Sequence, residues 1–169
     1  TRTQIETLRL AHPCHLITMD VRKILAGETE RQKECDRVLK AVCTPHKEAT
    51  VLGICTAGSR EDVFSMEEMS SRLGILPCDI SQRINTALAA VAQQALQHKQ
   101  LGIGGLYTSG GEVTVAVVRT LKAGGFSVRD QVLPLAVYGH IIGGEHPELP
   151  MITRGGFVGD KDSLWACVD

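Results

Sequence analysis

Helix-like and strand-like segments alternate along this chain, and the alternation limits its fold more than any other feature of the sequence. Residues 35–42 carry apolar side chains at the spacing i, i+3, i+4 and i+7, which predicts a helix with one buried face. Residues 14–18 and 49–55 are short apolar segments, and the β-branched residues of the second suit a strand covered on both faces. The order of these segments predicts a single α/β domain of three layers, with a central mixed sheet and helices on both faces.

Capping patterns predict several helix boundaries. Residues 29–32 and 65–68 match T-x-x-Q and S-x-x-E capping boxes, in which two side chains satisfy free backbone groups at a helix start. Gly74 is expected to end the second of these helices. Asp79 is expected to cap the longest helix of the chain, which Gly102 would end.

The last third of the chain combines short strands with glycine-rich turns. Strands are predicted at residues 105–108, 132–142 and 151–153, with an interruption at Pro134. A helix with an apolar face follows the first of these strands, and Gly124-Gly125 is expected to end it. Neither an internal repeat nor a linker divides the chain, so all 169 residues are predicted to form one domain.

The balance of charges excludes one broad class of function. The chain has 18 Lys and Arg residues against 19 Asp and Glu residues, a formal net charge of −1 at pH 7. This charge does not fit a nucleic-acid or membrane binder that works through bulk positive charge. The sequence has no recognisable signal peptide and no apolar run of about 20 residues. Its start at Thr1, directly in a helix-like segment, suggests a piece of a longer polypeptide.

The six cysteines predict a reducing environment. No two of them form a C-x-x-C pair, which excludes zinc-ribbon and thioredoxin-type sites. Most lie among apolar neighbours, as buried free thiols do. We therefore expect a cytoplasmic protein with reduced cysteines. They are Cys14, Cys35, Cys43, Cys55, Cys78 and Cys167.

The strongest chemical signal is the segment Tyr107–Thr114, in which a strand runs into Ser109-Gly110-Gly111 and then into a helix. Free backbone N–H groups at the helix start favour an anion such as phosphate, and glycine lets a ligand approach the backbone closely. Glu112 would repel a phosphate, which suggests that it faces a ribose hydroxyl or a nucleotide-bound Mg²⁺. The same spacing also fits an ordinary turn between a strand and a helix.

A second glycine-rich segment, Thr153–Asp160, also follows a predicted strand and contains three glycines beside Arg154. In open α/β sheets, ligands bind beyond the carboxyl ends of the strands. We therefore expect Arg154 and Gly155 to form one wall of a pocket, opposite Gly111. A solvent-exposed surface turn is the alternative interpretation of this segment.

The histidines carry a weaker signal. His12 and His15 flank Pro13-Cys14 with metal-ligand residue types, but no second cluster completes a zinc site. His140 and His146 are expected at the surface. No Ser/His/Asp or Cys/His combination has a recognisable motif around it, so neither a catalytic residue nor a metal ligand is predicted in this chain.

The order of these motifs resembles that of the C-terminal nucleotide-binding domain of the four-carbon acid sugar kinase family, over nearly the whole chain. That domain has a T-x-x-Q-I segment, a G-G-[DE] loop, a V-L-P segment and a glycine loop that ends in an acidic residue. Two positions depart from the pattern: Leu135 stands where many members have glycine, and Arg154 where lysine is usual. The matching residues are Thr1, Gln4 and Ile5; Gly110, Gly111 and Glu112; Val132, Leu133 and Pro134; and Thr153, Gly155, Gly156, Gly159 and Asp160.

The resemblance implies that the whole protein is an ATP- and Mg²⁺-dependent kinase of threonate, erythronate or a 3-oxo-tetronate. It also implies that an N-terminal domain, absent from this chain, binds the sugar acid and supplies the catalytic base, so the chain alone should be inactive. A homo-oligomer is compatible with it. The nucleotide would contact Thr1, Gln4, Ser109, Gly110, Gly111, Glu112, Val113, Thr114, Arg154, Gly155 and Gly156.

A non-catalytic α/β module that binds a ligand or a partner protein is the alternative. The near-neutral charge and the lack of a self-contained catalytic group permit it. An upstream domain of about 200 residues that opens with an Asp-Asp-x-T-G-like turn would favour the kinase.

Overall fold

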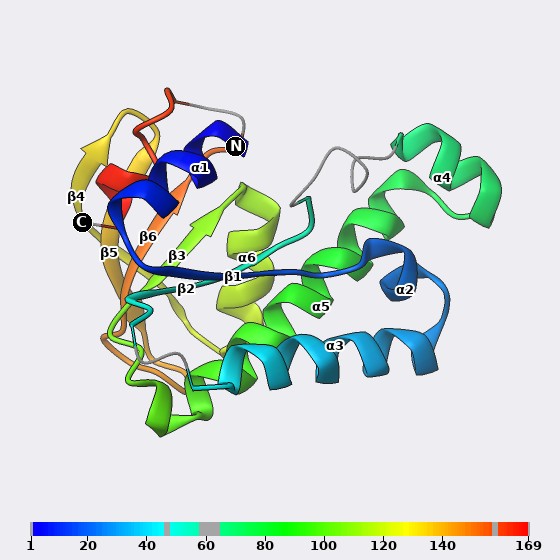
Figure 1. Cartoon of the computed structure of the whole chain (residues 1–169), viewed down its shortest axis with the longest axis horizontal. Helices are drawn as coiled ribbons and strands as arrows, with labels where there is room; N and C mark the ends of the chain where they lie inside the picture. Colours follow the sequence, from blue (N-terminus) through cyan, green and yellow to red (C-terminus); the bar gives the residue numbers. More distant parts are fainter. Residues whose placement is uncertain (1, 46–47, 58–64, 157–158, 169) are drawn as a thin grey trace.

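The computed structural model describes residues 2–45, 48–57, 65–156 and 159–168 of the chain (Figure 1). Its elements confirm the predicted α/β class. The first half contains α1 (Arg2–Ala11), β1 (Cys14–Thr18), α2 (Val21–Leu25), α3 (Glu28–Cys43), β2 (Val51–Cys55), α4 (Met66–Leu73) and α5 (Pro77–Gln97). The second half contains the short helix η1 (Lys99–Leu101), β3 (Leu106–Ser109), α6 (Gly111–Thr120), β4 (Gly125–Leu133), β5 (Ala136–Ile142), β6 (Pro150–Arg154) and the short helix η2 (Trp165–Cys167).

The strands of the described residues form two sheets, where the sequence predicted one central sheet. β1 and β2 pair in parallel, with Ile17 opposite Ile54. The second sheet has the strand order β3-β6-β5-β4, in which β3 runs parallel to β6 and the other two pairs are antiparallel. The mixed strand directions that the sequence predicted therefore occur in this second sheet.

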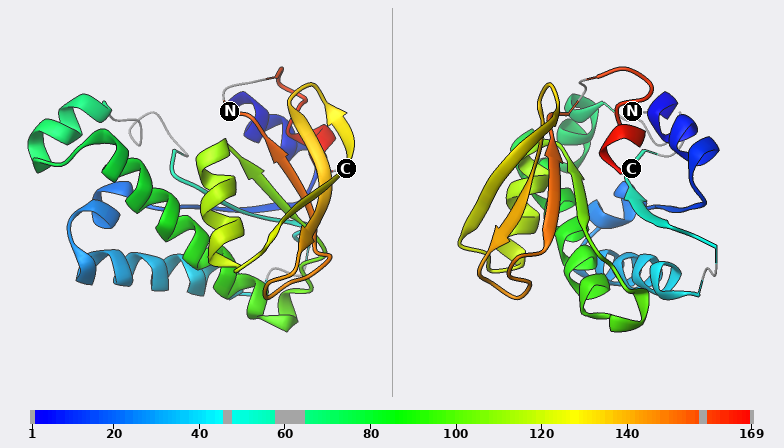
Figure 2. Two further views of the ribbon diagram at one scale, coloured as in Figure 1. Left: turned by 180° about the vertical axis from the view of Figure 1, so that it is seen from behind. Right: turned by 90° about the vertical axis from the view of Figure 1, so that its left-hand side faces the viewer.

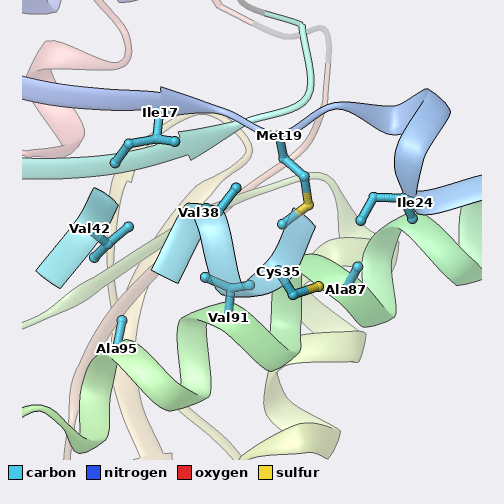
Figure 3. Packing of buried hydrophobic residues seen from close by; sticks show 9 residues of the cluster. All are labelled: Ile17, Met19, Ile24, Cys35, Val38, Val42, Ala87, Val91 and Ala95. Carbon is cyan, nitrogen blue, oxygen red and sulfur yellow. The ribbon is translucent and has the colours of Figure 1, made fainter. Parts of the chain in front are cut away.

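Helix α5 joins the two parts of the molecule, because it packs on two sides (Figures 1 and 2). Its Val91 lies in a core with Val38 of α3 and Ile17 of β1, which Figure 3 shows. Its Ala89 lies in a second core with Val117 of α6, the helix that covers the four-stranded sheet. A helix that is apolar on two sides must be covered on both, and the packing of α5 in two cores meets this requirement. The predicted end at Gly102 is wrong, since this glycine ends η1 instead.

A β-hairpin replaces the single interrupted strand that was predicted at residues 132–142. β4 begins already at Gly125, and β5 follows a turn at Pro134 and Leu135. The φ of Leu135 is 63°, a left-handed conformation that favours glycine. The prediction that Gly124-Gly125 ends α6 is wrong, because this helix stops at Thr120 and Gly125 opens the hairpin.

Of the other predicted helix caps, those at Ser65 and Gly74 are confirmed and those at Thr29 and Asp79 are wrong. Ser65 accepts a hydrogen bond of 3.3 Å from the N–H of Glu68 at the start of α4, and Gly74 ends that helix in a left-handed conformation. In contrast, α3 begins one residue before Thr29, and α5 begins two residues before Asp79. A proline opens α5, and its fixed φ suits the first helical position.

The cysteines are free, but the expectation that most of them are buried is wrong. Cys35 and Cys167 are buried, Cys78 is exposed and the other three are half-buried. Within the described ranges, the helices are too short or too polar to cross a membrane.

Candidate functional site

The two glycine-rich loops lie next to each other at one end of the four-stranded sheet. β3 and β6 are parallel neighbours, with Thr108 opposite Thr153 and Ser109 opposite Arg154, so both strands end at the same edge. The N–H of Gly110 donates a hydrogen bond of 2.9 Å to the main-chain oxygen of Arg154. The carboxyl edge where α/β sheets bind ligands is therefore lined here by both loops.

Helix α6 begins at this edge of the sheet, and no side chain caps its first turn. Gly110 is its N-cap residue, with a φ of 99°, a conformation that residues with a Cβ rarely adopt. Gly111 is the first helical residue, and a Cβ built on it would meet no described atom within 4 Å. The first amide N–H groups of a helix have no partner within the helix. They form, with the helix dipole, a site suited to an anion.

The side chains around this helix start point in different directions. Glu112 is exposed, and its Oε2 accepts a hydrogen bond of 3.3 Å from Nδ2 of Asn85 on α5. Val113 is half-buried against the core between α6 and the sheet, which is a packing role. Ser109 is exposed at the end of β3. Among these three, Ser109 and Glu112 are the side chains that a ligand at the sheet edge could reach.

Three threonine hydroxyls meet directly beneath the glycine turn. Oγ1 of Thr114 lies 2.9 Å from Oγ1 of Thr108 and 2.7 Å from Oγ1 of Thr153, and it donates to the main-chain oxygen of Gly110 at 3.0 Å. Thr108 and Thr153 therefore face α6. No single segment of the sequence contains all three residues, so the cluster arises only when β3 and β6 pair.

Arg154 lies on the opposite face of the sheet from α6, because successive residues of a strand point to opposite faces. Its side chain is only 4% exposed, which excludes the interpretation of a solvent-exposed arginine on a surface turn. Burial raises the pKa of Tyr107, while the charge of Arg154 and hydrogen bonds with Ser109 and Arg154 oppose this rise. Burial also raises the pKa of Cys167, again against the charge of Arg154. Tyr107 and Cys167 therefore both lie near the guanidinium.

The guanidinium of Arg154 has no carboxylate partner among the described residues. Its Nε is buried and makes no hydrogen bond with them. A buried cation without a counter-charge is unfavourable, so this group is suited to a nearby anion. A Cβ on Gly159, which has a φ of 88°, would come within 3.2 Å of Nη2, so Gly159 lies close to the guanidinium.

Gln4 connects the first helix to that same loop. Its side chain is 6% exposed, and its Nε2 donates to the main-chain oxygen of Asp160 at 2.7 Å. The Asp160 carboxylate accepts hydrogen bonds from Oγ of Ser163, at 2.7 Å, and from the N–H of Asp162, at 3.1 Å. These bonds lower the pKa of Asp160. The predicted contact of Thr1 lies outside the described residues.

A family model described as the nucleotide-binding C-terminal domain matches residues 1–164. The chain belongs to this family. It is 38% identical to a D-erythronate kinase from Heliobacterium modesticaldum over 169 residues, which are 100% of this chain and 38% of that kinase. It is 23% identical to a D-threonate kinase from Salmonella typhimurium over 164 residues, which are 97% of this chain and 38% of that kinase. The chain thus spans about two fifths of the length of these relatives.

The fold of this nucleotide-binding domain also occurs in a solved structure. A domain of unknown function from Bordetella bronchiseptica, crystallised with citrate as a domain-swapped dimer, matches with a TM-score of 0.65 at 21% identity. The match covers 99% of this chain and 37% of the other. The two proteins therefore share a fold.

A surface cavity of about 630 Å³ lies elsewhere in the nucleotide-binding domain, around the end of α5 and the segment that precedes β3. His98, Lys99, Glu145 and His146 line it. It is at the amino end of β3, whereas the glycine loops are at the carboxyl end. His140 and His146, both expected at the surface, are half-buried, and each has a buried ring nitrogen without a described partner.

Proposed function

We propose that this chain is the ATP-binding domain of a kinase that phosphorylates a four-carbon sugar acid such as erythronate or threonate. The observation that carries the proposal is the parallel pairing of β3 with β6, which brings two glycine loops and an uncapped helix start to one sheet edge. The relatives named D-erythronate kinase and D-threonate kinase support this substrate class.

In this proposal the phosphates of ATP lie on the N-terminus of α6. Phosphoryl transfer depends mainly on positioning and charge neutralisation. The free amides that start with Gly111 would bind phosphate oxygens, with Ser109 beside them and the backbone of Gly155 and Gly156 on the neighbouring strand end. Arg154 would neutralise phosphate charge from the other face of the sheet, where its guanidinium has no described counter-ion.

Mg²⁺ would enter with the nucleotide. The described residues contain no cluster of three or more metal-ligating side chains, which fits an ion held mainly by phosphate oxygens and water. Glu112 would be its protein ligand, because its exposed carboxylate stands in the first turn of α6. The ion would neutralise charge on the phosphates when bound.

The remaining parts of the reaction belong, in this proposal, to a second domain of the whole protein. That domain would bind the sugar acid and supply the base that accepts the proton of the attacking hydroxyl. The free cysteines support a reducing, cytoplasmic setting for the enzyme.

The test is a kinase assay of the complete protein with ATP, Mg²⁺ and a panel of four-carbon sugar acids. We expect phosphorylation of erythronate or threonate by the complete protein, and no turnover by residues 1–169 alone. Turnover by the isolated chain would contradict the division of labour between the domains. ATP binding without phosphorylation of any acid would favour a non-catalytic ligand-binding module.

A further inference from the structure

The Thr114 hydroxyl makes more hydrogen bonds than any other hydroxyl near the glycine turn. A threonine hydroxyl has one proton to donate and two lone pairs with which to accept. The Gly110 carbonyl can only accept, so the single proton of Thr114 goes there, over 3.0 Å. Thr108 and Thr153 then donate their own protons to Thr114, over 2.9 and 2.7 Å. In this arrangement every hydrogen-bonding position of the Thr114 hydroxyl is used.

Two hydrogen bonds from Thr114 hold the Gly110 carbonyl, and with it the direction of one peptide group. The Gly110 carbonyl also accepts the N–H of Thr114 at 3.0 Å, so it points along α6 into the protein. In a planar trans peptide the C=O and the following N–H point in opposite directions. The N–H of Gly111 therefore points out of the helix, toward the sheet edge.

The other two threonines attach this turn to the sheet. Thr108 comes from β3 and Thr153 from β6, so their bonds to Thr114 hold the start of α6 against the ends of both strands. Backbone at a glycine turn has wide conformational freedom. The hydroxyl cluster restricts that freedom at the two residues where a phosphate would approach.

We propose that Thr114 is a positioning residue, whose hydroxyl holds the Gly110–Gly111 peptide so that its free N–H is aimed at the phosphates of the nucleotide. This inference rests on the proposed function. Thr114 acts through the backbone and has no proton left to donate to the ligand. Its effect should therefore appear in the recognition of phosphate and be absent from the recognition of the nucleoside.

The test compares ATP with adenosine as ligands of the whole protein that contains this chain, by isothermal titration calorimetry. Thr114→Val keeps the shape of the side chain and removes the hydroxyl, and we expect it to raise the Kd for ATP about tenfold with the Kd for adenosine unchanged. Thr114→Ser should restore ATP binding. Thr120→Val is the matched control on the same helix, because its hydroxyl makes no hydrogen bond with described residues, and it should leave both constants unchanged.

Each outcome decides the inference. If Thr114→Val binds ATP as tightly as the wild type, or weakens ATP and adenosine equally, Thr114 is not a positioning residue for phosphate. If that variant does not fold, Thr153→Val removes one donor of the same cluster and is judged by the same two ligands. A wild-type protein that binds no ATP would overturn the proposed function and this inference together.

Discussion

The two parallel strand pairs of this domain end in different ways. β1 and β3 are both followed by a turn and a helix, α2 and α6, so the two ends have the same local topology. At β1, charged side chains of the protein satisfy the backbone of the turn. At β3, glycine stands at the helix start, and no side chain caps the first backbone N–H groups of α6.

The end of β1 is satisfied by three side chains. The Asp20 carboxylate accepts the N–H of Arg22 at 2.9 Å and so caps α2. Oε1 of Glu34 accepts the N–H of Asp20 at 2.7 Å, and Nη2 of Arg37 donates to the main-chain oxygen of Thr18 at 2.7 Å. In this domain a strand end is therefore suited to a ligand where glycine replaces the protein's own capping side chains.

The largest effect is expected when a side chain that satisfies the turn after β1 is removed. Glu34→Ala removes a side chain that is 1% exposed. It leaves the Asp20 N–H without its acceptor and the Arg37 guanidinium without its carboxylate partner. We expect the free energy of unfolding in urea to fall by about 3 kcal/mol. Glu30→Ala is the matched control on the same helix, because its ion pair with Lys33 is at the surface, and it should cost less than about 0.5 kcal/mol. Equal losses would contradict the stabilising role given to Glu34.

At the β3 end, the second largest effect is expected from Arg154. Arg154→Ala should raise the Kd for ATP by about tenfold to a hundredfold, since it removes a charge-assisted contact with phosphate. Because this side chain is 4% exposed, the variant should also lose about 1–3 kcal/mol of stability. Arg129→Ala removes an exposed cation from β4 of the same sheet and should change neither quantity. A destabilised Arg154→Ala protein with unchanged ATP affinity would give Arg154 a purely structural role.

A side chain on Gly111 should weaken ATP binding at the β3 end. Gly111→Val should raise the Kd for ATP about tenfold because the side chain blocks the approach of the phosphates, while the fold has room for it. Gly104→Val is a matched control before the amino end of β3, where a Cβ also meets no described atom within 4 Å. Calorimetric titration of ATP into both proteins makes the measurement. The same affinity in both would mean that Gly111 serves the turn alone.

Much of the β3 end could be predicted from the sequence because its signals are local. A strand followed by Ser109-Gly110-Gly111 and a second strand followed by Arg154 are visible as short patterns. The pairing of these two strands is a long-range contact with no local signal. The face on which Arg154 lies follows from strand alternation only once α6 is known to cover Thr108 and Thr153.

The β1 end could not be predicted in the same way. Glu34 lies within a charged stretch of α3 that resembles a solvent-exposed face, and its burial depends on how that helix packs against the turn after β1. The T-x-x-Q pattern around Thr29 was a competing local signal, and the helix begins before it. Similarly, the contact of Gln4 with Asp160 spans the whole chain, so only the family resemblance indicated that these two segments belong together.

The smallest effect is expected from a fall in pH, which should weaken the β1 end through its buried carboxylate. Burial alone would raise the pKa of Glu34, but hydrogen bonds from Arg37 and from the Asp20 backbone, with the charges of Arg37 and Lys23, lower it overall. A carboxylate whose pKa is lowered on folding stabilises the fold above its unfolded pKa, near 4.5, and loses that contribution as the pH falls through the folded value. The wild type should therefore lose more stability between about pH 6 and pH 3 than Glu34→Gln does. Each loss is measured from the free energy of unfolding of the same protein at about neutral pH.

Urea denaturation of both proteins across this range measures the difference between their slopes. Glu34→Gln keeps the shape of the side chain and an oxygen that can accept the Asp20 N–H, so the comparison isolates the charge from the packing. Glu30→Gln, on the exposed face of α3, should follow the wild type. Parallel slopes for the wild type and Glu34→Gln would mean that the buried carboxylate does not hold the β1 end through its charge. The turn after β1 would then rest on packing and neutral hydrogen bonds, as the glycine turn after β3 does.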